Sequence, residues 1–546
     1  MSTYMNLRNF GKKVTTTSVE CQTLINHGLL QLFGFNHEEA IRCFKKALDF
    51  DKSCAMAHYF IAYGNAPNYN NPNGLDLTAA FEESQKAMEE AKNGNVSEWE
   101  MDLIKAQLHR FCSPPDSQSS AELSRNYVNK MRPVYLKYGK EDADIASFFA
   151  EALMGLGPWK LWTPPPDYKP AIPETEELIE VLETSLSTYP NHPGLCHLCI
   201  HTMELSSTPE KALPAADALR NGGYEQGHLL HMPSHIDIWV GHYKEALEVN
   251  KSAINADEIY TEKTGQDNEF YKLYRVHNLQ FAVWAAMFDG QYSTAMKYAK
   301  ALEKQISVEA ATVMIGPIPF GVMFLESYAC VPWHVLVRFG KWEEILKYPL
   351  KEEKDVYVAT ISTAHYARTV AYAVTGRLKE AEAERSKFYA SLKNETYKIR
   401  HMHNNIMHDP ERHCGVLDVA EAVMNGEVEY QKGNIEEGFK HLRLAIERDT
   451  NLMYDEPWGW MMPSRHVFGA LLLEQDRAAE AEIVYQEDLK QYKNNMWSLL
   501  GLCQALKQQN KAEEAKVAQD LFQKASVRTD VDVQASCLCA TKICCH

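Results

Sequence analysis

Seven turn signals recur along the chain and constrain its fold more than any other feature of the sequence. In each one, a glycine or a small polar residue separates two helical patterns, and a small or apolar residue follows five positions later. The pairs are Gly241 with Ala246, Gly290 with Ala295, Gly340 with Ile345, Gly376 with Ala381, Gly433 with Gly438, Asp476 with Ala481, and Asn510 with Ala515. Glycine gives the backbone the freedom to end a helix, and the small residue lets the next helix pack closely. The pattern therefore predicts a series of helix pairs.

An earlier copy of this pattern has a recognisable spacing. Gly28, Ala40, Phe44 and Ala47 resemble the tetratricopeptide (TPR) consensus, although Lys52 stands where that consensus has proline. No sustained alternation of apolar and polar residues indicates strands. We therefore expect an all-α fold, a TPR-like right-handed superhelix of antiparallel helix pairs, or α-solenoid.

The domain organisation follows from the same reading. A chain of 546 residues exceeds what one compact core usually holds, so its length implies either two or more domains or a repeat solenoid. We expect a single continuous solenoid over 1–525, with N-terminal repeats at 20–150, central His-rich repeats at 175–300 and C-terminal repeats at 330–525. The remaining residues, 526–546, are expected to form a flexible Cys-rich tail.

Composition narrows the range of partners and compartments. The net charge of −17 repels phosphate backbones, so we expect no nucleic-acid partner. No apolar run is long enough to span a bilayer, and the start of the chain has no secretory signal. The 13 cysteines are scattered and odd in number, which favours free thiols and a cytoplasmic location.

Several longer segments are more specific than the turn signals. They are PNYNNP at 67–72, PWKLWTP at 158–164, HPGLCHLCIHTMELSSTPEKA at 192–212, GHLLHMPSHIDIWVGHYKEA at 227–246, HNLQFAVWAAMFDGQ at 277–291, RFGKWEEIL at 338–346 and YDEPWGWMMPSR at 454–465. Together they resemble a group of poorly characterised bacterial TPR-domain proteins. Cys196 and Cys199 depart from that pattern, because they stand where small or aromatic residues are expected. The resemblance implies a helical repeat fold with a shared internal site, and it brings no established reaction.

Histidines concentrate in the middle of the chain, with seven of them between positions 192 and 242 against 21 in all 546 residues. His197, His201 and Glu204 are spaced four and three residues apart, so a helix places them on one face. Two imidazoles one turn apart can bind a single transition metal, and a carboxylate one turn further can complete the site.

A second set, His228, His231 and His235, also shares one helical face. Pro233 interrupts it and is expected in the first turn of a new helix, where its missing N–H is tolerated. We expect the two sets to converge, with the five histidines as metal ligands and with Glu204 and His277 as catalytic residues. Buried histidines could instead form a structural hydrogen-bond network, and for the isolated His192, His242 and His334 we favour that interpretation.

Other residues are weaker candidates. Trp159, Glu456, Trp460 and Arg465 could form the rim of a substrate pocket, with Arg465 holding a carboxylate. The tryptophans could equally anchor ordered loops. Two groups of cysteines could bind a soft metal: the Cys196–Cys199 pair, and the terminal Cys537, Cys539, Cys544, Cys545 and His546. It is equally simple to suppose that these residues have no specific function.

Two classes of function remain open from the sequence. The first is an enzyme whose His-rich site holds one or two ions of copper, iron or zinc and oxidises a small-molecule substrate. A metal-dependent hydrolase is an alternative within this class. The second is a TPR scaffold that binds a protein or peptide in its groove. A homodimer is compatible with either class. No phosphate-binding glycine loop, G-x-S-x-G elbow or H-E-x-x-H motif is present, so nucleotide, serine and standard metalloprotease hydrolysis are disfavoured.

Overall fold

The computed structural model describes residues 7, 10–94, 96–163, 167–266, 268 and 270–540. The chain forms two compact units. The first comprises Met1–Ile236 and Lys251–Arg275, and the second comprises Asp237–Asn250 and Val276–His546. A single continuous solenoid over 1–525 was expected from the sequence, and that expectation stays a prediction. The boundaries fall inside helices, which no turn signal can reveal.

The first unit is built from short and medium helices. They are α1 (Val19–Phe33), α2 (His37–Phe50), α3 (Ala55–Asn65), α4 (Leu77–Asn93), α5 (Glu98–Gln107), η1 (Leu108–Arg110), η2 (Pro115–Ser117), α6 (Ser120–Tyr138), α7 (Ala143–Met154), α8 (Glu174–Thr188), α9 (Pro193–Met203), η3 (Pro209–Ala212), α10 (Leu213–Asn221) and α11 (Gly227–His231). Three helices contain the boundaries between the units. They are α12 (Pro233–Val240), α13 (Tyr243–Thr264) and α14 (Lys272–Phe288).

The second unit continues with further helices and one small hairpin. They are α15 (Tyr292–Gln305), α16 (Val308–Thr312), η4 (Gly321–Leu325), η5 (Glu326–Cys330), α17 (Val331–Arg338), α18 (Trp342–Lys347), α19 (Val358–Val374), α20 (Leu378–Ser391), η6 (Glu395–Lys398), β1 (His401–Met402), β2 (Asn405–Ile406), α21 (Val416–Gln431), α22 (Ile435–Thr450), α23 (Ser464–Glu474), α24 (Ala478–Gln491), α25 (Met496–Gln508) and α26 (Ala512–Ala525). The antiparallel β1–β2 pair is the only sheet among the described residues.

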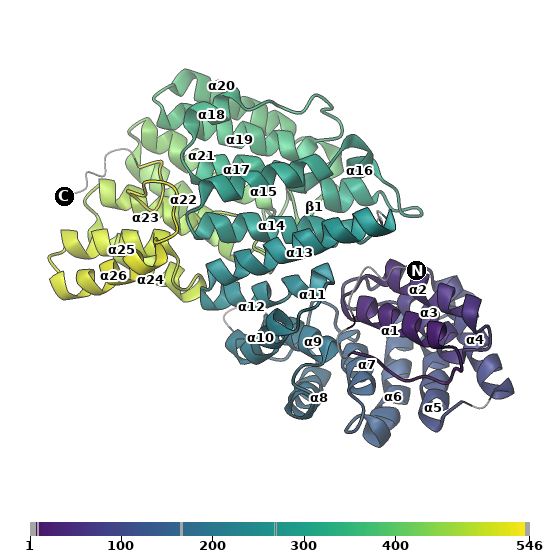
Figure 1. Ribbon diagram of the computed structural model, residues 1–546. Helices are drawn as coiled ribbons and strands as arrows, with labels where there is room; N and C mark the ends of the chain where they lie inside the picture. Colours follow the sequence, from purple (N-terminus) through teal and green to yellow (C-terminus); the bar gives the residue numbers. More distant parts are fainter. Residues whose placement is uncertain are drawn as a thin grey trace. The chain divides into compact units, whose positions relative to one another are not determined.

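Consecutive helices pack as pairs in both units (Figure 1). The α1–α2 pair shows which residues make two consecutive helices form and pack together. Ser18 caps α1 by accepting a hydrogen bond from the Cys21 N–H. At Gly28, an added Cβ would lie 2.3 Å from the ring of Phe44, so only glycine allows this approach of the two helices. Ala40, Phe44 and Ala47 are all completely buried in the same contact.

The seven turn residues read from the sequence all adopt the left-handed conformation. Their φ values lie between 54° and 89°. This conformation ends one helix and reverses the chain, and it suits glycine, with Asp and Asn as tolerated substitutes. The partner five positions later is buried in each case. The prediction of an all-α, TPR-like fold of antiparallel helix pairs is confirmed.

The segment that follows α26 contains the described part of the tail that the sequence was expected to leave flexible. Residues 526–540 pack against the second unit, where the Ser536 hydroxyl donates to the His466 carbonyl over 2.8 Å. Arg338 donates to the Ser536 carbonyl over 3.1 Å. Ser536 is fully buried. Residues 541–546 lie outside the described residues.

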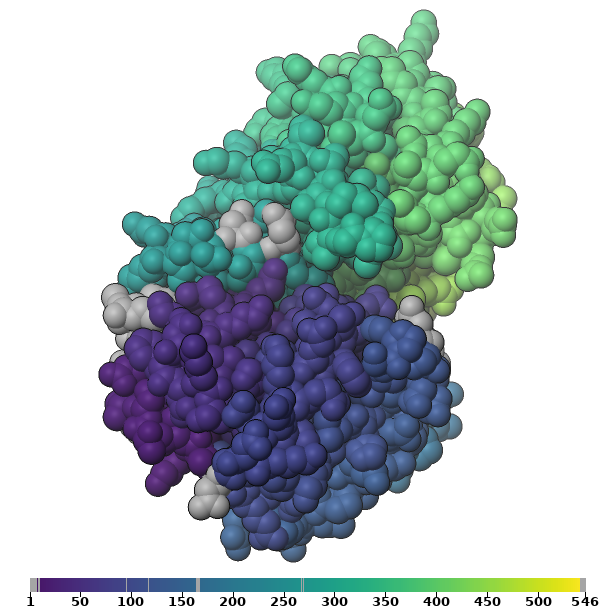
Figure 2. Space-filling model, turned by 90° about the vertical axis from the view of Figure 1, so that its right-hand side faces the viewer, coloured from purple at the N-terminus to yellow at the C-terminus, as the bar shows by residue number. Residues whose placement is uncertain are grey.

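Among the described residues, no helix combines the length and the apolar character required to cross a membrane. Figure 2 shows one face of the first unit as a closed surface of purple and blue side chains. The histidines of this unit discussed next are buried within it.

Candidate metal centre

The first histidine set lies on α9. His192 caps this helix by accepting a hydrogen bond from the Leu195 N–H, and Pro193 occupies its first position. His197 and His201 follow one turn apart on the same face, and both are completely buried. Glu204 comes directly after the helix with a helical backbone, and its side chain is also fully buried.

The second set lies on α11 and α12. The side chain of Gln226 accepts from the Leu229 N–H and starts α11, which carries His228 and His231. At Gly227, an added Cβ would lie 2.0 Å from the Asp257 carboxylate, so glycine is needed for α11 to pack beside α13. Pro233 begins α12, as the sequence predicted, and His235 follows it.

All six residues of the two sets belong to the first unit, and the fold brings them together. The imidazole rings of His197 and His228 are 5.0 Å apart between centroids, and those of His197 and His201 are 4.9 Å apart. His197, His201 and His228 each offer a ring nitrogen, and these three nitrogens lie within 4.8 Å of one another. We call these three residues the histidine triad.

Hydrogen bonds fix which ring nitrogen of His197 and of His201 faces the triad. His197 donates from Nδ1 to the Phe33 carbonyl, 2.5 Å away, which leaves its Nε2 as a lone-pair donor for a metal. Among the described residues, that Nε2 has no hydrogen-bond partner. His201 donates from Nδ1 to Glu204 Oε1 over 2.7 Å, so the Nε2 of His201 also carries the lone pair. Metal-binding histidines are commonly oriented in this way, by a carboxylate or a backbone carbonyl.

The remaining residues form a chain of hydrogen bonds behind His201. Glu204 Oε2 accepts from His235 Nδ1 over 2.7 Å, and His235 Nε2 contacts His231 Nε2 over 2.7 Å. With neutral rings, His231 donates to His235 and its Nδ1 faces the Ser234 hydroxyl, 3.3 Å away. We call Glu204, His235 and His231 the relay. The sequence placed His231 and His235 among the metal ligands, and that role stays a prediction.

The electrostatics of the site are dominated by burial. Burial alone would raise the pKa of Glu204, but the electrostatic interactions and hydrogen bonds with His235 and His201 outweigh it and lower that pKa below its ordinary value. Glu204 is therefore a carboxylate at neutral pH. Burial, reinforced by His201, holds the pKa of His197 well below its ordinary value, so this imidazole stays neutral.

Aromatic rings surround the triad. Phe35 lies 4.3 Å from His197, and Tyr274 lies 4.6 Å from His228, both between ring centroids. Tyr69 and Trp159 stack on each other and reach His201 at 5.5 and 6.3 Å. Among these four residues, only Trp159 is a site residue predicted from the sequence. Tyr69 sits in one of the distinctive segments, but nothing local marked Phe35 or Tyr274.

Two of these rings are held in an unusual backbone conformation. Phe35 and Trp159 have φ values of 55° and 59°, which bulky residues rarely adopt. Such conformations persist only where the surroundings enforce them, and they concentrate at functional sites. Their position beside the triad fits that tendency.

The other predicted site residues lie in the second unit. His277 is buried, with its ring 5.9 Å from His403 and 5.1 Å from Phe281. Trp460 packs edge-on against His334 and Tyr366, in the manner of a loop anchor. Glu456 is buried, and Arg465 contacts the Thr450 hydroxyl at 3.4 Å. Their roles in catalysis and substrate binding stay predictions.

The cysteine candidates separate into two kinds. Cys196 and Cys199 are free thiols, and burial raises the pKa of Cys199 to about 12. Cys537 and Cys539 form a disulfide in the segment that packs on the second unit. Cys544, Cys545 and His546 lie outside the described residues.

Comparisons with known proteins add little to this site. No family model matches the sequence, and no curated protein matches it. A structure of the human IFIT1 dimer with m7Gppp-AAAA aligns with 94% of this chain and 96% of that chain, at 14% identity and a TM-score of 0.32. Yeast Tom70 aligns with 92% of this chain and 94% of that chain, at 12% identity and a TM-score of 0.29. Similarities this low say nothing about what the chain binds or catalyses.

Proposed function

We propose that this protein is a metal-dependent enzyme of TPR-like fold that holds one transition-metal ion at the histidine triad. The observation that carries the proposal is the convergence of three buried ring nitrogens within 4.8 Å of one another. The segments that resemble the bacterial TPR-domain proteins contribute all three histidines, which supports a shared internal site.

The hydrogen bonding of His197 argues for a metal over a structural network. Its Nδ1 donates to a backbone carbonyl, so its Nε2 can only accept, and it has no described partner. Leaving such a group buried and unsatisfied costs about 1–3 kcal/mol. A metal ion bound at the Nε2 of His197 removes this penalty.

The ligand set indicates the class of metal. Three neutral imidazoles with no carboxylate suit copper, iron or zinc better than magnesium or calcium. Three protein ligands also leave coordination positions open for substrate, as in catalytic sites in general. We therefore infer oxidation of a small molecule at a copper or iron ion as the reaction class.

Hydrolysis at zinc is the second candidate, and the relay makes it weaker. A zinc-bound water is most useful with a free carboxylate nearby to take its proton. Both oxygens of Glu204 already accept hydrogen bonds, from His201 and His235. The scaffold alternative, a TPR groove that binds a protein, has no comparable observation in its favour.

Elemental analysis of protein purified without a histidine tag tests the metal. After loading with copper, iron or zinc and removal of excess, the parent should retain about one equivalent of one of these metals per chain. His201→Ala should lose it, and His231→Ala should keep it with reduced affinity. His109→Ala, which removes an exposed histidine of the same unit, is the matched control. A parent that retains no stoichiometric metal, or a His201→Ala variant that keeps it, refutes the proposal.

Catalysis needs a separate measurement. Oxygen consumption by the metal-loaded parent is compared with that of His201→Ala over a panel of small phenols, amines and thiols. Turnover that depends on His201 supports the oxidase class. Tight metal binding without turnover on such a panel would favour a metal-binding scaffold instead.

A further inference from the structure

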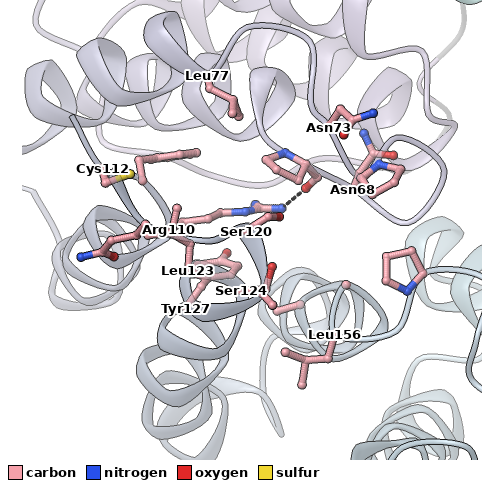
Figure 3. Close-up of a pocket in the computed structure, with 18 of the residues that line it drawn as sticks. Asn68, Asn73, Leu77, Arg110, Cys112, Ser120, Leu123, Ser124, Tyr127 and Leu156 are labelled. Carbon is pink, nitrogen blue, oxygen red and sulfur yellow. Dashed lines mark hydrogen bonds between the residues drawn. The ribbon is translucent and has the colours of Figure 1, made fainter. Parts of the chain in front are cut away.

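A cavity of about 390 Å³ lies in the first unit, apart from the histidine triad. Its walls come from η1, from the start of α6, and from the loops that follow α3 and α7. Figure 3 shows Arg110 extending between Leu77 on one wall and Ser124 and Tyr127 on the other. The volume is within the range of about 300–1,000 Å³ that is usual for small-molecule sites.

Arg110 is held rigidly in this cavity. Its guanidinium lies over the rings of Tyr63 and Tyr127, at 4.8 and 4.6 Å from their centroids. Nη2 donates to the Pro67 carbonyl, as the dashed line in Figure 3 marks. Nη1 is buried and has no hydrogen-bond partner among the described residues. The cation is therefore fixed by aromatic faces and keeps unused donor capacity.

A buried carboxyl group, that of Glu151, interacts electrostatically with this cation. Glu151 accepts a hydrogen bond from the Tyr63 hydroxyl through Oε2, while its Oε1 is buried without a described partner. Burial raises the pKa of Glu151 and outweighs the opposing effect of Arg110. The Tyr127 hydroxyl is also buried, and Tyr59 and Arg110 are its hydrogen-bonding neighbours. An anion beside Arg110 would satisfy the Nη1 donor, which has no partner among the described residues.

The rest of the lining is largely apolar. Phe111, Leu123 and Leu156 face the cavity together with Leu77 and several prolines. We propose that this cavity binds a small carboxylic acid with an apolar body, whose carboxylate is held by Arg110 and whose body packs against these side chains. Guanidinium and carboxylate are complementary in both charge and geometry. Isolated waters could satisfy the polar atoms, but they would not explain the apolar walls.

The cavity shares two loops with the metal centre. Asn68 and Pro158 line the cavity, and the residues that follow them, Tyr69 and Trp159, stack beside His201. An acid bound in the cavity would therefore contact residues that directly precede, in the chain, two rings lying beside His201. The inference does not rest on the proposed metal chemistry, since every group it uses belongs to the cavity.

Calorimetric titration of the full, metal-free chain tests the proposal with two matched probes, octanoate and octanamide. They have the same length and differ in charge. Octanoate should bind about tenfold or more tightly than octanamide, because a hydrogen bond to a charged group is stronger than a neutral one. Arg110→Met should abolish this preference. Lys92→Met, which removes an exposed cation elsewhere in the unit, should keep it.

A second variant covers the case in which Arg110→Met does not fold. Ser124→Trp fills the cavity and leaves Arg110 intact, so it should bind neither probe while its circular dichroism stays that of the parent. Equal binding of the two probes overturns the proposal. So does the absence of octanoate binding at millimolar concentration, and so does octanoate binding that survives in Ser124→Trp.

Discussion

The substitution Glu204→Gln probes the arrangement of the metal centre most directly. The amide has nearly the shape of the carboxylate, so packing is preserved, but it carries no charge and only one acceptor oxygen. In the parent, two Nδ1–H groups donate to the carboxylate, each over 2.7 Å. In the variant, the amide oxygen can serve only one of them.

The expected magnitude follows from these two bonds. A hydrogen bond to a charged group contributes about 1.5–3 kcal/mol. If the amide oxygen faces His201, its bond weakens to a neutral one. If it faces His235, the His201 ring loses its orienting acceptor. Either outcome weakens the hydrogen bond that orients the His201 ring and its Nε2 lone pair. Loss of such a supporting group typically lowers metal affinity about 10- to 100-fold.

The assay is a competition titration of metal-loaded protein against a chelator of known affinity, for the parent, Glu204→Gln and the control His109→Ala. Circular dichroism and thermal unfolding of the metal-free proteins establish that the variant is folded. Glu204→Gln should lose about one to two orders of magnitude in affinity. An affinity within twofold of the parent would refute the idea that Glu204 orients a ligand.

Three further predictions concern stability. Burial raises the pKa of Glu427 to about 8, so the folded state holds this proton to higher pH than the unfolded state. Stability is therefore lost as the pH rises from about 4.3 to about 8, and Glu427→Gln should raise the free energy of unfolding at pH 7 by about 3–4 kcal/mol. Urea denaturation of the parent and the variant at several pH values measures this difference. If the two proteins show the same pH profile, the prediction is wrong. Arg400→Met leaves the buried Glu326 without its ion-pair partner at 2.6 Å and should lower the free energy of unfolding by about 3–5 kcal/mol. Adding Glu326→Gln to this variant should restore part of the loss. A loss below about 1 kcal/mol would count against the prediction. Gly28→Val places a side chain against the Phe44 ring and should cost about 1–3 kcal/mol or more in a denaturant titration, whereas an unchanged midpoint would show that α1 and α2 can move apart.

Much of the architecture could be predicted from local sequence. The seven turn residues, of which Gly241 is the first and Asn510 the last, predict helix ends because few residue types accept a left-handed backbone. All seven adopt that conformation. Pro233 begins α12 because proline fits the first turn of a helix and is disfavoured further in. The pairing of His197 with His201 on one face follows from helical geometry alone.

Only the tertiary structure decided which of these residues act together. Periodicity put His197, His201 and Glu204 in one set, yet the fold joins the first two to His228 and turns Glu204 toward His235. The Phe33 carbonyl, the cavity around Arg110 and the boundaries inside α12, α13 and α14 carried no local signal. They depend on contacts between residues far apart in the chain, for example 164 positions between His197 and Phe33, and spacing along one helix does not encode them. The sequence by itself determined the helices and the faces that carry histidine; packing between helices determined which nitrogens converge and which group orients them.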